Sequence, residues 1–388
     1  MPTIEPTKSK RILIVTHYYP PHTGGIEYVA QNQAKQLAAL GDIVTVVTSR
    51  VSADEVSHTE NGVRLVRVRA FNGFEKWGIP FPIFSPRLIT VLFRTVKAAQ
   101  VVHIHDAFYL SSWCAAIIAR IYRRPIVLTQ HIDLVPHASR LVKIIQQLVY
   151  GTVGAVIFRH SATIIVLNER VKRFLVDQGV DGSKIILAFN GVDSQLFRPA
   201  APEEKKIIRD KYQLSKTKKI ILFVGRVVHK KGFDKVLAAA SEQYQLVFVG
   251  GDFGPNRSLN VRCLGKLPQS QLAEIYQAAD IFVLPAHSEG FPLTIQEAMA
   301  SGLPVIMADD DGYAAYELDQ NLVYLLQQRP SSEQVREAIQ SLLNDDARCQ
   351  SMASQSLQYA RQHFVWQRVA DQLDQIYAGL LHAQHEVV

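Results

Sequence analysis

The stretch from Ser288 to Ile306, SEGFPLTIQEAMASGLPVI, contains the clearest structural signal in the sequence. The apolar run Ile281–Leu284 before it predicts a buried strand, and Gly290 allows a sharp turn. Thr294–Ala300 then predicts a short helix, with Glu297 in its first turns. A strand, a tight turn and a helix start bring unpaired backbone N–H groups and the positive end of the helix dipole to one point. The stretch therefore predicts an anion site.

Two glutamates, Glu289 and Glu297, stand beside this predicted anion site with seven residues between them. Carboxylates do not bind phosphate, but they accept hydrogen bonds from hydroxyl groups. A ligand with hydroxyls on both sides of its phosphates is a nucleotide sugar. The two carboxylates therefore favour a nucleotide sugar as the ligand.

The composition indicates a globular protein of two domains. The chain has 388 residues, 48% of them hydrophobic, which is enough for two cores. Three scattered cysteines favour a reducing compartment over a disulfide framework or a zinc site.

The N-terminal sequence MPTIEPTKSKR lacks the apolar segment of a secretory signal. The uncharged stretch 144–158 is short for a membrane span and predicts a buried or interfacial helix. We expect a cytoplasmic protein.

The net charge of +7 is unevenly distributed. Residues 1–196 contain 22 Lys+Arg and 13 Asp+Glu, or +9, whereas residues 197–388 contain 20 and 22, or −2. A basic face that serves only solubility is one interpretation. The other is an acidic partner, such as the inner face of the cell membrane. Nucleic acid is disfavoured because no basic-and-aromatic reading motif is present. The basic clusters are Arg120/Arg123/Arg124, Arg140/Lys143 and Arg170/Lys172/Arg173.

Short apolar runs alternate with helical patterns along both halves of the chain, which predicts an α/β fold with mostly parallel sheets. The break falls near 190–202, where NGVD and two prolines interrupt regular structure. We expect an N-terminal domain over 1–196, a second over 197–363, and a C-terminal helix in 364–388. Strands are predicted at 11–16, 43–48, 63–68, 101–105, 126–129, 163–167, 220–224, 246–249, 281–284 and 305–307.

Two loops carry further candidates for phosphate binding. Gly24 and Gly25 lie between the first strand and the first helix, where their amides can face a phosphate. Arg226 and Lys231 stand five residues apart in the loop after the 220–224 strand, and two such cations can clamp a diphosphate. Each loop alone is also compatible with an ordinary solvated turn.

The chain resembles the retaining glycosyltransferases of family 4. The resemblance rests on the two glutamates with EAMASGLPVI, on Pro21-x-x-Gly24-Gly25 before the first helix, and on Gly225-Arg226 with Lys231-Gly232. It implies the GT-B fold, in which two doubly wound Rossmann-like domains face each other across a cleft. The C-terminal helix would then pack back on the N-terminal domain. The segment DDDGYAAYEL, 309–318, departs from the usual Gly-Gly-x-x-Glu pattern.

The resemblance also implies roles for individual residues. Glu289 would approach the transferred sugar and Glu297 the ribose hydroxyls, while Arg226 and Lys231 would bind the donor diphosphate. His131 would hydrogen-bond the donor sugar or the transition state, as at a corresponding strand end in several family members; His103, His105 and Asp106 are its rivals. The other donor-binding residues would be Gly24, Gly25, Leu267, Gly290, Phe291, Leu293 and Thr294.

The expected function is transfer of a hexosyl unit, with retention, from a UDP- or GDP-sugar to an acceptor glycan or lipid-linked sugar. Polysaccharide or glycolipid synthesis would be the context. No Asp-x-Asp or other metal spacing is present, so no obligatory metal is expected. The alternatives are a GT-B sugar-nucleotide epimerase or hydrolase, and a non-catalytic nucleotide-sugar-binding protein.

Overall fold

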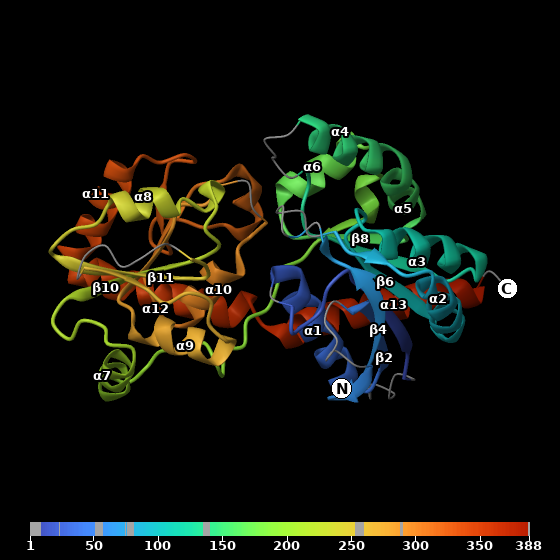
Figure 1. Ribbon diagram of the computed structural model, residues 1–388, viewed down its shortest axis with the longest axis horizontal. Helices are drawn as coiled ribbons and strands as arrows, with labels where there is room; N and C mark the ends of the chain where they lie inside the picture. Colours follow the sequence, from blue (N-terminus) through green and yellow to red (C-terminus); the bar gives the residue numbers. More distant parts are fainter. Residues whose placement is uncertain are drawn as a thin grey trace. The chain divides into compact units, whose positions relative to one another are not determined.

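The computed structural model describes residues 9–22, 24–50, 57–73, 75, 81–134, 140–252, 260–287 and 290–386. The chain divides into two compact units (Figure 1). Unit 1 combines Met1–Ala188 with Trp366–Val388, and unit 2 is Phe189–Val365. The first change of unit therefore comes before the boundary expected at 196, and the second just after the one expected at 363.

Unit 1 contains a mostly parallel sheet with the strand order β3-β4-β2-β1-β6-β7-β8-β9. β3 and β5 both pair antiparallel with β4, while the remaining pairs are parallel. The strands are β1 (Arg11–Val15), β2 (Ile43–Arg50), β3 (His58–Glu60), β4 (Val63–Phe71), β5 (Ile83–Phe84), β6 (Val101–His105), β7 (Ile126–Gln130), β8 (Thr163–Val166) and β9 (Ile185–Leu187).

Helices cover this sheet: α1 packs against α13, and α2 packs against α3 (Figure 1). α4 runs through a π-helical turn, η2, directly into α5. The helices are α1 (Gly25–Ala39), α2 (Arg87–Ala98), α3 (Leu110–Ile121), α4 (Arg140–Val149), η2 (Tyr150–Gly154), α5 (Ala155–His160), α6 (Glu169–Asp177), η3 (Gly182–Lys184) and α13 (Trp366–Glu386).

The last helix, α13, is an integral part of unit 1 although it follows unit 2 in the sequence. Lys10, just before β1, donates to Asp374 at 2.5 Å. The hydroxyl of Tyr377 lies 2.6 Å from Nδ1 of the buried His103 in β6. Both Lys10 and His103 are nearly inaccessible to solvent. α13 therefore supplies one partner each to two buried polar groups of unit 1, which also meet Asp42 and Thr129.

Unit 2 contains a parallel sheet with the strand order β12-β11-β10-β13-β14-β15. α8 and α11 pack together on one face, and α9, α10 and α12 cover the other (Figure 1). The strands are β10 (Lys219–Val224), β11 (Tyr244–Val249), β12 (Val261–Cys263), β13 (Ile281–Leu284), β14 (Val305–Ala308) and β15 (Tyr324–Leu326). The helices are α7 (Pro202–Lys211), η4 (His229–Lys231), α8 (Phe233–Ala238), α9 (Gln269–Ala278), α10 (Leu293–Ala300), η5 (Asp311–Tyr316), α11 (Ser332–Leu343) and α12 (Asp346–His363).

The central strands are buried on both faces, which explains why they read as continuous apolar runs. β13 (IFVL) is fully buried along its length, as are β6 and β7. A parallel strand covered by helices on both sides has no solvated face, so alternation of polar and apolar residues disappears. Polar side chains are consequently concentrated at the strand ends.

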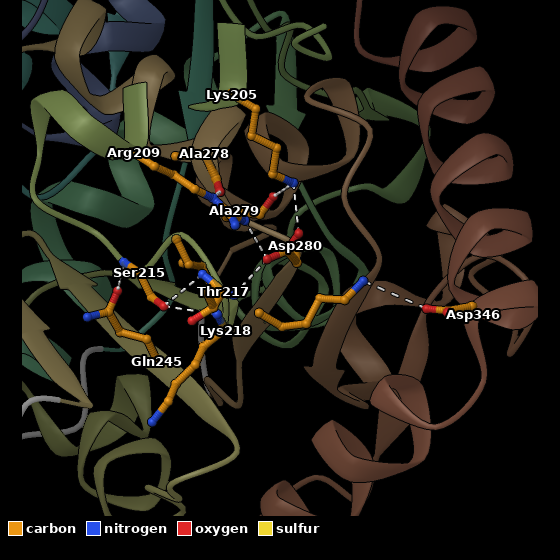
Figure 2. Close-up of polar contacts among 12 residues, drawn as sticks. Lys205, Arg209, Ser215, Thr217, Lys218, Gln245, Ala278, Ala279, Asp280 and Asp346 are labelled. Carbon is orange, nitrogen blue, oxygen red and sulfur yellow. Dashed lines mark hydrogen bonds and ion pairs between the residues drawn. The ribbon is translucent and has the colours of Figure 1, made fainter. Parts of the chain in front are cut away.

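A polar network holds the amino end of β13 in unit 2. The carboxylate of Asp280 accepts from Lys205 at 2.8 Å, from Arg209 at 2.6 Å and from the backbone N–H of Ile220 at 2.6 Å (Figure 2). Burial raises the pKa of Asp280, but its two cationic partners bring the pKa below its ordinary value. At Lys205, burial lowers the pKa by more than the ion pair with Asp280 raises it, so the pKa is below its ordinary value. The network joins α7, β10 and β13 at one carboxylate.

We predict that Asp280→Asn lowers the free energy of unfolding by about 2–3 kcal/mol at pH 7, because it leaves two half-buried cations without a counter-charge. The folded-state pKa is depressed, so this contribution is present above the unfolded pKa of about 3.9 and disappears as the pH falls through the folded value. Urea unfolding measures the difference.

The matched control is Asp346→Asn. Asp346 makes a looser, exposed ion pair with Lys219 at 3.7 Å (Figure 2), so its loss should change the unfolding free energy by less than about 1 kcal/mol. Equal losses in the two variants would show that Asp280 has no special role.

Candidate functional site

The strand order of each unit creates a switch point, where neighbouring connections run in opposite directions along the sheet. In unit 2, β10 lies between β11 and β13; in unit 1, β1 lies between β2 and β6. Ligands of doubly wound sheets bind outside the carboxyl ends of the strands at such points. A residue predicted to bind the donor should therefore lie in a loop at one of these two switch points.

The loops after β10 and β13 meet at the switch point of unit 2. Arg226 follows Gly225 just after the end of β10, and its side chain is exposed. Lys231 is half-buried at the end of η4. The backbone N–H of His287, which follows β13, donates to the carbonyl of Lys230 at 3.0 Å. The loop with the two candidate cations is thus fastened to the loop that leads into the glutamate motif.

Two glycines allow this crowded backbone arrangement. Gly232 has φ 71°, and a Cβ there would lie 2.8 Å from the carbonyl oxygen of Pro285. Gly250, at the end of β11, has φ 114°, and a Cβ there would lie 2.5 Å from the carbonyl oxygen of Gly225. A side chain at either position would separate the strand ends. Because the backbones lie so close together here, main-chain groups line the carboxyl edge of the sheet.

α10 begins at the same edge, after Pro292, so Leu293 and Thr294 form its first turn. Phe291 is buried just before the helix, with its ring stacked 3.8 Å from that of Tyr316. Tyr313 meets Phe291 edge-on at 5.2 Å. Both tyrosines belong to the 309–318 segment that departs from the family pattern. That segment therefore supports the start of α10 with aromatic packing in place of glycines.

Glu297 lies within α10 and is almost inaccessible, with 6% of its surface exposed. Its Oε2 accepts a hydrogen bond from the Tyr276 hydroxyl at 3.0 Å, and the same hydroxyl lies 3.1 Å from the carbonyl oxygen of Thr294. Burial raises the pKa of Glu297 to about 7, although the bond from Tyr276 opposes the shift. A buried carboxylate poised near neutrality is a frequent property of ligand sites.

The other predicted donor-binding residues of unit 2 lie nearby or outside the described residues. Gly265 follows β12, and its carbonyl accepts from the N–H of Gly250 at 2.8 Å. Leu267, two residues on, packs partly against the core, so only part of it can face a ligand. Gly290 is half-buried before Phe291. Glu289 lies outside the described residues.

In unit 1, Gly24 and Gly25 stand at the start of α1, close to the switch point. Gly24 is the residue before the helix, and Gly25 is its first residue. Glu27, in the first turn, is buried, and its Oε1 is 2.7 Å from Nδ1 of His22. Burial would lower the pKa of His22, but hydrogen bonds and charges from Glu27 and Glu75 raise it above the ordinary value. An ion pair thus fixes the loop before the helix.

A cluster of buried imidazoles lies at the carboxyl ends of β1, β6 and β7. Nδ1 of His105 is 3.0 Å from Nε2 of His131, and the backbone N–H of His131 donates to Asp106 at 2.9 Å. The ring of His17 stacks on Tyr109 with centroids 3.5 Å apart. Nδ1 of His17 and Nε2 of His105 have no hydrogen-bond partner within the described part of the chain. These atoms remain available to a ligand or to water.

Burial sets the ionisation state of this cluster. It lowers the pKa of His103 and of His131 to about 3, and it also lowers those of His17 and His105. Burial raises the pKa of Asp106 to about 7. The imidazoles are therefore neutral at pH 7 and act as hydrogen-bonding groups. Since Nε2 of His131 is engaged by His105, Nδ1 is the ring nitrogen that can meet a ligand.

Arg226, Lys231 and the start of α10 thus share one sheet edge, and Gly25 and His131 lie at the switch-point edge of unit 1. His103 differs because it faces inward and pairs with Tyr377 and with Thr129 Oγ1, the latter at 2.7 Å.

The sequence analysis did not identify Tyr276, which carries no local signal. It also did not identify the Gly250-Gly251 pair, although its position after an apolar run was a local signal. Within the described ranges, no group of three or more His, Cys, Asp or Glu side chains has metal-site geometry.

Comparison with known proteins agrees with this geometry. The family model for glycosyl transferases group 1 matches residues 204–362, and that for glycosyltransferase family 4 matches 23–196. The D-inositol 3-phosphate glycosyltransferase of Corynebacterium aurimucosum is 27% identical, and the alignment covers 92% of this chain and 91% of that protein.

Solved structures show the same fold. Sucrose-phosphate synthase from Thermosynechococcus elongatus has a TM-score of 0.76 at 22% identity, covering 96% of this chain and 100% of the other. HepE from Anabaena in complex with UDP-glucose has a TM-score of 0.74 at 17% identity, covering 95% and 100%. The two Rossmann-like parallel sheets are those of the GT-B class. The chain belongs to the group 1 glycosyltransferases of family 4.

We predict that the unfolding free energy of Glu297→Gln, measured relative to wild type, rises by about 2 kcal/mol when the pH is raised from 5 to 8. The folded-state pKa of Glu297, about 7, lies above the unfolded value of about 4.3. The stability that this shift contributes is complete below the unfolded value and is lost as the pH rises through 7. The glutamine variant has no such loss, and its side-chain amide can still accept from Tyr276.

Urea unfolding at the two pH values tests this expectation. Glu333→Gln is the control, because Glu333 is exposed and forms an ion pair with Arg336 in the same helix, α11, at 3.1 Å. A pH-independent difference between wild type and Glu297→Gln would mean that the Glu297 pKa is not raised.

Proposed function

We propose that this glycosyltransferase moves a hexosyl unit from a UDP- or GDP-sugar to an acceptor hydroxyl with retention of the anomeric configuration. The observation that carries the proposal is the convergence at the switch point of unit 2. There the exposed Arg226, the half-buried Lys231 and the first turn of α10 share one sheet edge, with Glu297 buried behind them. This combination suits a diphosphate flanked by hydroxyl groups.

The chemistry follows from the charge that develops as the donor breaks. When the sugar–phosphate bond opens, negative charge grows on the departing diphosphate. Arg226, Lys231 and the N–H groups of Leu293 and Thr294 stabilise this charge. In the retaining mode, the acceptor hydroxyl arrives on the face that the diphosphate leaves. No step of this scheme requires a metal ion.

Further contacts are proposed for the two ends of the donor. Glu297 accepts from the ribose hydroxyls, with Tyr276 holding its orientation, and Leu267 borders the base. Glu289 accepts from hydroxyls of the transferred sugar, while Gly290 and Phe291 contribute backbone groups. In unit 1, Gly24 and Gly25 offer amides to the phosphates. His131 hydrogen-bonds the sugar through Nδ1 in its neutral form, since its pKa is about 3.

UDP-glucose in the HepE complex supports a UDP-sugar as donor. The name of the Corynebacterium relative supports a phosphorylated cyclitol or a sugar as acceptor. We favour an acceptor carried by a glycan or lipid in polysaccharide or glycolipid synthesis, with the enzyme bound peripherally to the inner face of the cell membrane. The reason is the net charge of +9 on residues 1–196, which would attract an anionic surface. In the described part of the chain, no helix is both long and apolar enough to cross a bilayer.

The experiment that tests the proposed reaction is transfer from UDP- and GDP-sugars in the presence of EDTA, with acceptors that include inositol phosphate. Proton NMR of the product reads the anomeric configuration. Retention and full activity with the chelator are expected. An inverted product would contradict the mechanism, and hydrolysis or epimerisation without transfer would favour the alternative enzymes.

We predict that Arg226→Ala and Lys231→Ala each lower kcat by roughly 100-fold, with a smaller change in KM. Both cations meet charge that grows only as the diphosphate departs, so their loss affects the transition state more than the bound donor. The expected decrease in kcat is of the size seen when one hydrogen-bond donor to the transition state is removed. Lys206→Ala, an exposed lysine in α7, is the control. Wild-type kcat in either variant would remove that cation from the reaction.

A further inference from the structure

Unit 1 contains an apolar groove that the proposed glycosyl transfer does not use. The groove has a volume of about 400 Å³ and lies between α3 on one side and η2 and α5 on the other. Trp113 and Ile117 of α3 face Val153, Val156 and Ile157 across it. Ile117 and Val156 are exposed to 56% and 47%, so the groove is open to solvent. Its chemistry suits a hydrocarbon.

Basic groups gather at one end of the groove. Arg120 and His160 both line it, and Arg120 donates to Nε2 of His160. Slight burial, together with the charges of Arg120, Arg159 and Lys184, lowers the pKa of His160, so the three cations lie close to that ring. Lys184 also donates to the carbonyl of Arg159 at 3.3 Å. Asp181, fully exposed beside Lys184, is the carboxylate that interacts with this group.

The helices around the groove expose apolar side chains and carry no Asp or Glu. Ile121 at the end of α3 is 61% exposed, and Ile144 and Leu148 of α4 are 58% and 63% exposed. The helix predicted over 144–158 as buried or interfacial is therefore buried on one face, with Tyr150, Ile157 and Phe158, and exposed on the other. α2, α3, α4, η2 and α5 contain no Asp or Glu but carry Arg87, Arg94, Lys97, Arg120, Arg140, Lys143 and Arg159.

We propose that this groove holds a hydrocarbon chain of an anionic membrane phospholipid, whose phosphate is bound by Arg120, Arg159 and Lys184. The charge of the rim selects the occupant. A surface of exposed aliphatic side chains, on which cations outnumber carboxylates, complements an anionic bilayer, where apolar burial and charge attraction act together. A free anion would leave the apolar walls unused, and a neutral lipid would leave the cations unpaired.

This site deepens the proposed membrane contact and rests on it. A purely electrostatic contact would hold the enzyme at the headgroup layer and fade within a Debye length. A chain drawn into the groove would instead fix α3 and α5 against the bilayer. It would therefore bring Trp113, at the groove wall, next to lipid carbons.

Trp113 provides a direct measurement. The full chain is mixed with vesicles of phosphatidylglycerol and phosphatidylcholine whose acyl chains carry bromine, and tryptophan fluorescence is compared with that in unbrominated vesicles. Quenching is expected with phosphatidylglycerol, absent with phosphatidylcholine alone, and lost in Trp113→Phe, while Trp77 and Trp366 remain. Vesicle binding without quenching of Trp113 would overturn the groove assignment.

Matched substitutions separate the groove from general charge attraction. Ile117→Gln with Val156→Gln should weaken binding to phosphatidylglycerol vesicles about tenfold, whereas Ile207→Gln, at a 69% exposed site in α7 of unit 2, should leave it unchanged. Arg120→Gln should weaken it about fivefold. Equal binding by all variants would refute the site.

The same samples distinguish failure of this site from failure of the proposed function. Vesicle binding that is insensitive to the Ile117 and Val156 changes overturns only the groove. Loss of all binding to anionic vesicles, with sugar transfer to a soluble acceptor intact, overturns the membrane contact and the groove together. Self-association of the protein through this face, with no lipid quenching, would assign the groove to a protein interface and refute the lipid.

Discussion

The structure depends on one constraint: a parallel sheet covered on both faces accepts a polar side chain between its strand ends only where that side chain finds a buried partner. β1, β10 and β13 are apolar after their first residue, and the polar His103 at the centre of β6 is paired with Tyr377 and Thr129. Polar side chains that can meet a ligand are therefore concentrated in the loops at the carboxyl edge. The switch in strand order then selects, within each edge, the loops that can surround a ligand. Arg226, Lys231 and the α10 start occupy that position in unit 2, and the imidazole cluster occupies it in unit 1.

Much of this could be predicted from the sequence, because buried parallel strands leave a simple pattern. The predicted strands at 101–105 and 281–284 coincide with β6 and β13, and the other predicted strands differ from β1, β2, β4, β7, β8, β10, β11 and β14 mainly at their ends. The edge strands β3, β5, β9, β12 and β15 were not predicted, since they are only two or three residues long. The α/β class, the GT-B fold and the family were correct, because long motifs and strand–helix alternation are local properties of a sequence.

Contacts between distant segments could not be predicted. Nothing near Tyr276 signals that its hydroxyl orients Glu297, 21 residues away. The stacking of Phe291 on Tyr316 depends on η5, whose sequence departs from the family pattern. The interaction of His105 with His131 arises only when β6 and β7 pair in register. Such contacts depend on packing geometry, and periodicity does not encode it.

The return of α13 to unit 1 has a consequence for biosynthesis. On the ribosome, residues 9–187 emerge with all strands of the first sheet, but Tyr377 and Asp374 follow nearly two hundred residues later. Until then, the imidazole of His103 and the ammonium of Lys10 lack the partners that α13 supplies. Unit 2, by contrast, is contiguous in the sequence. The N-terminal unit, although made first, is thus completed only by the last helix of the described chain.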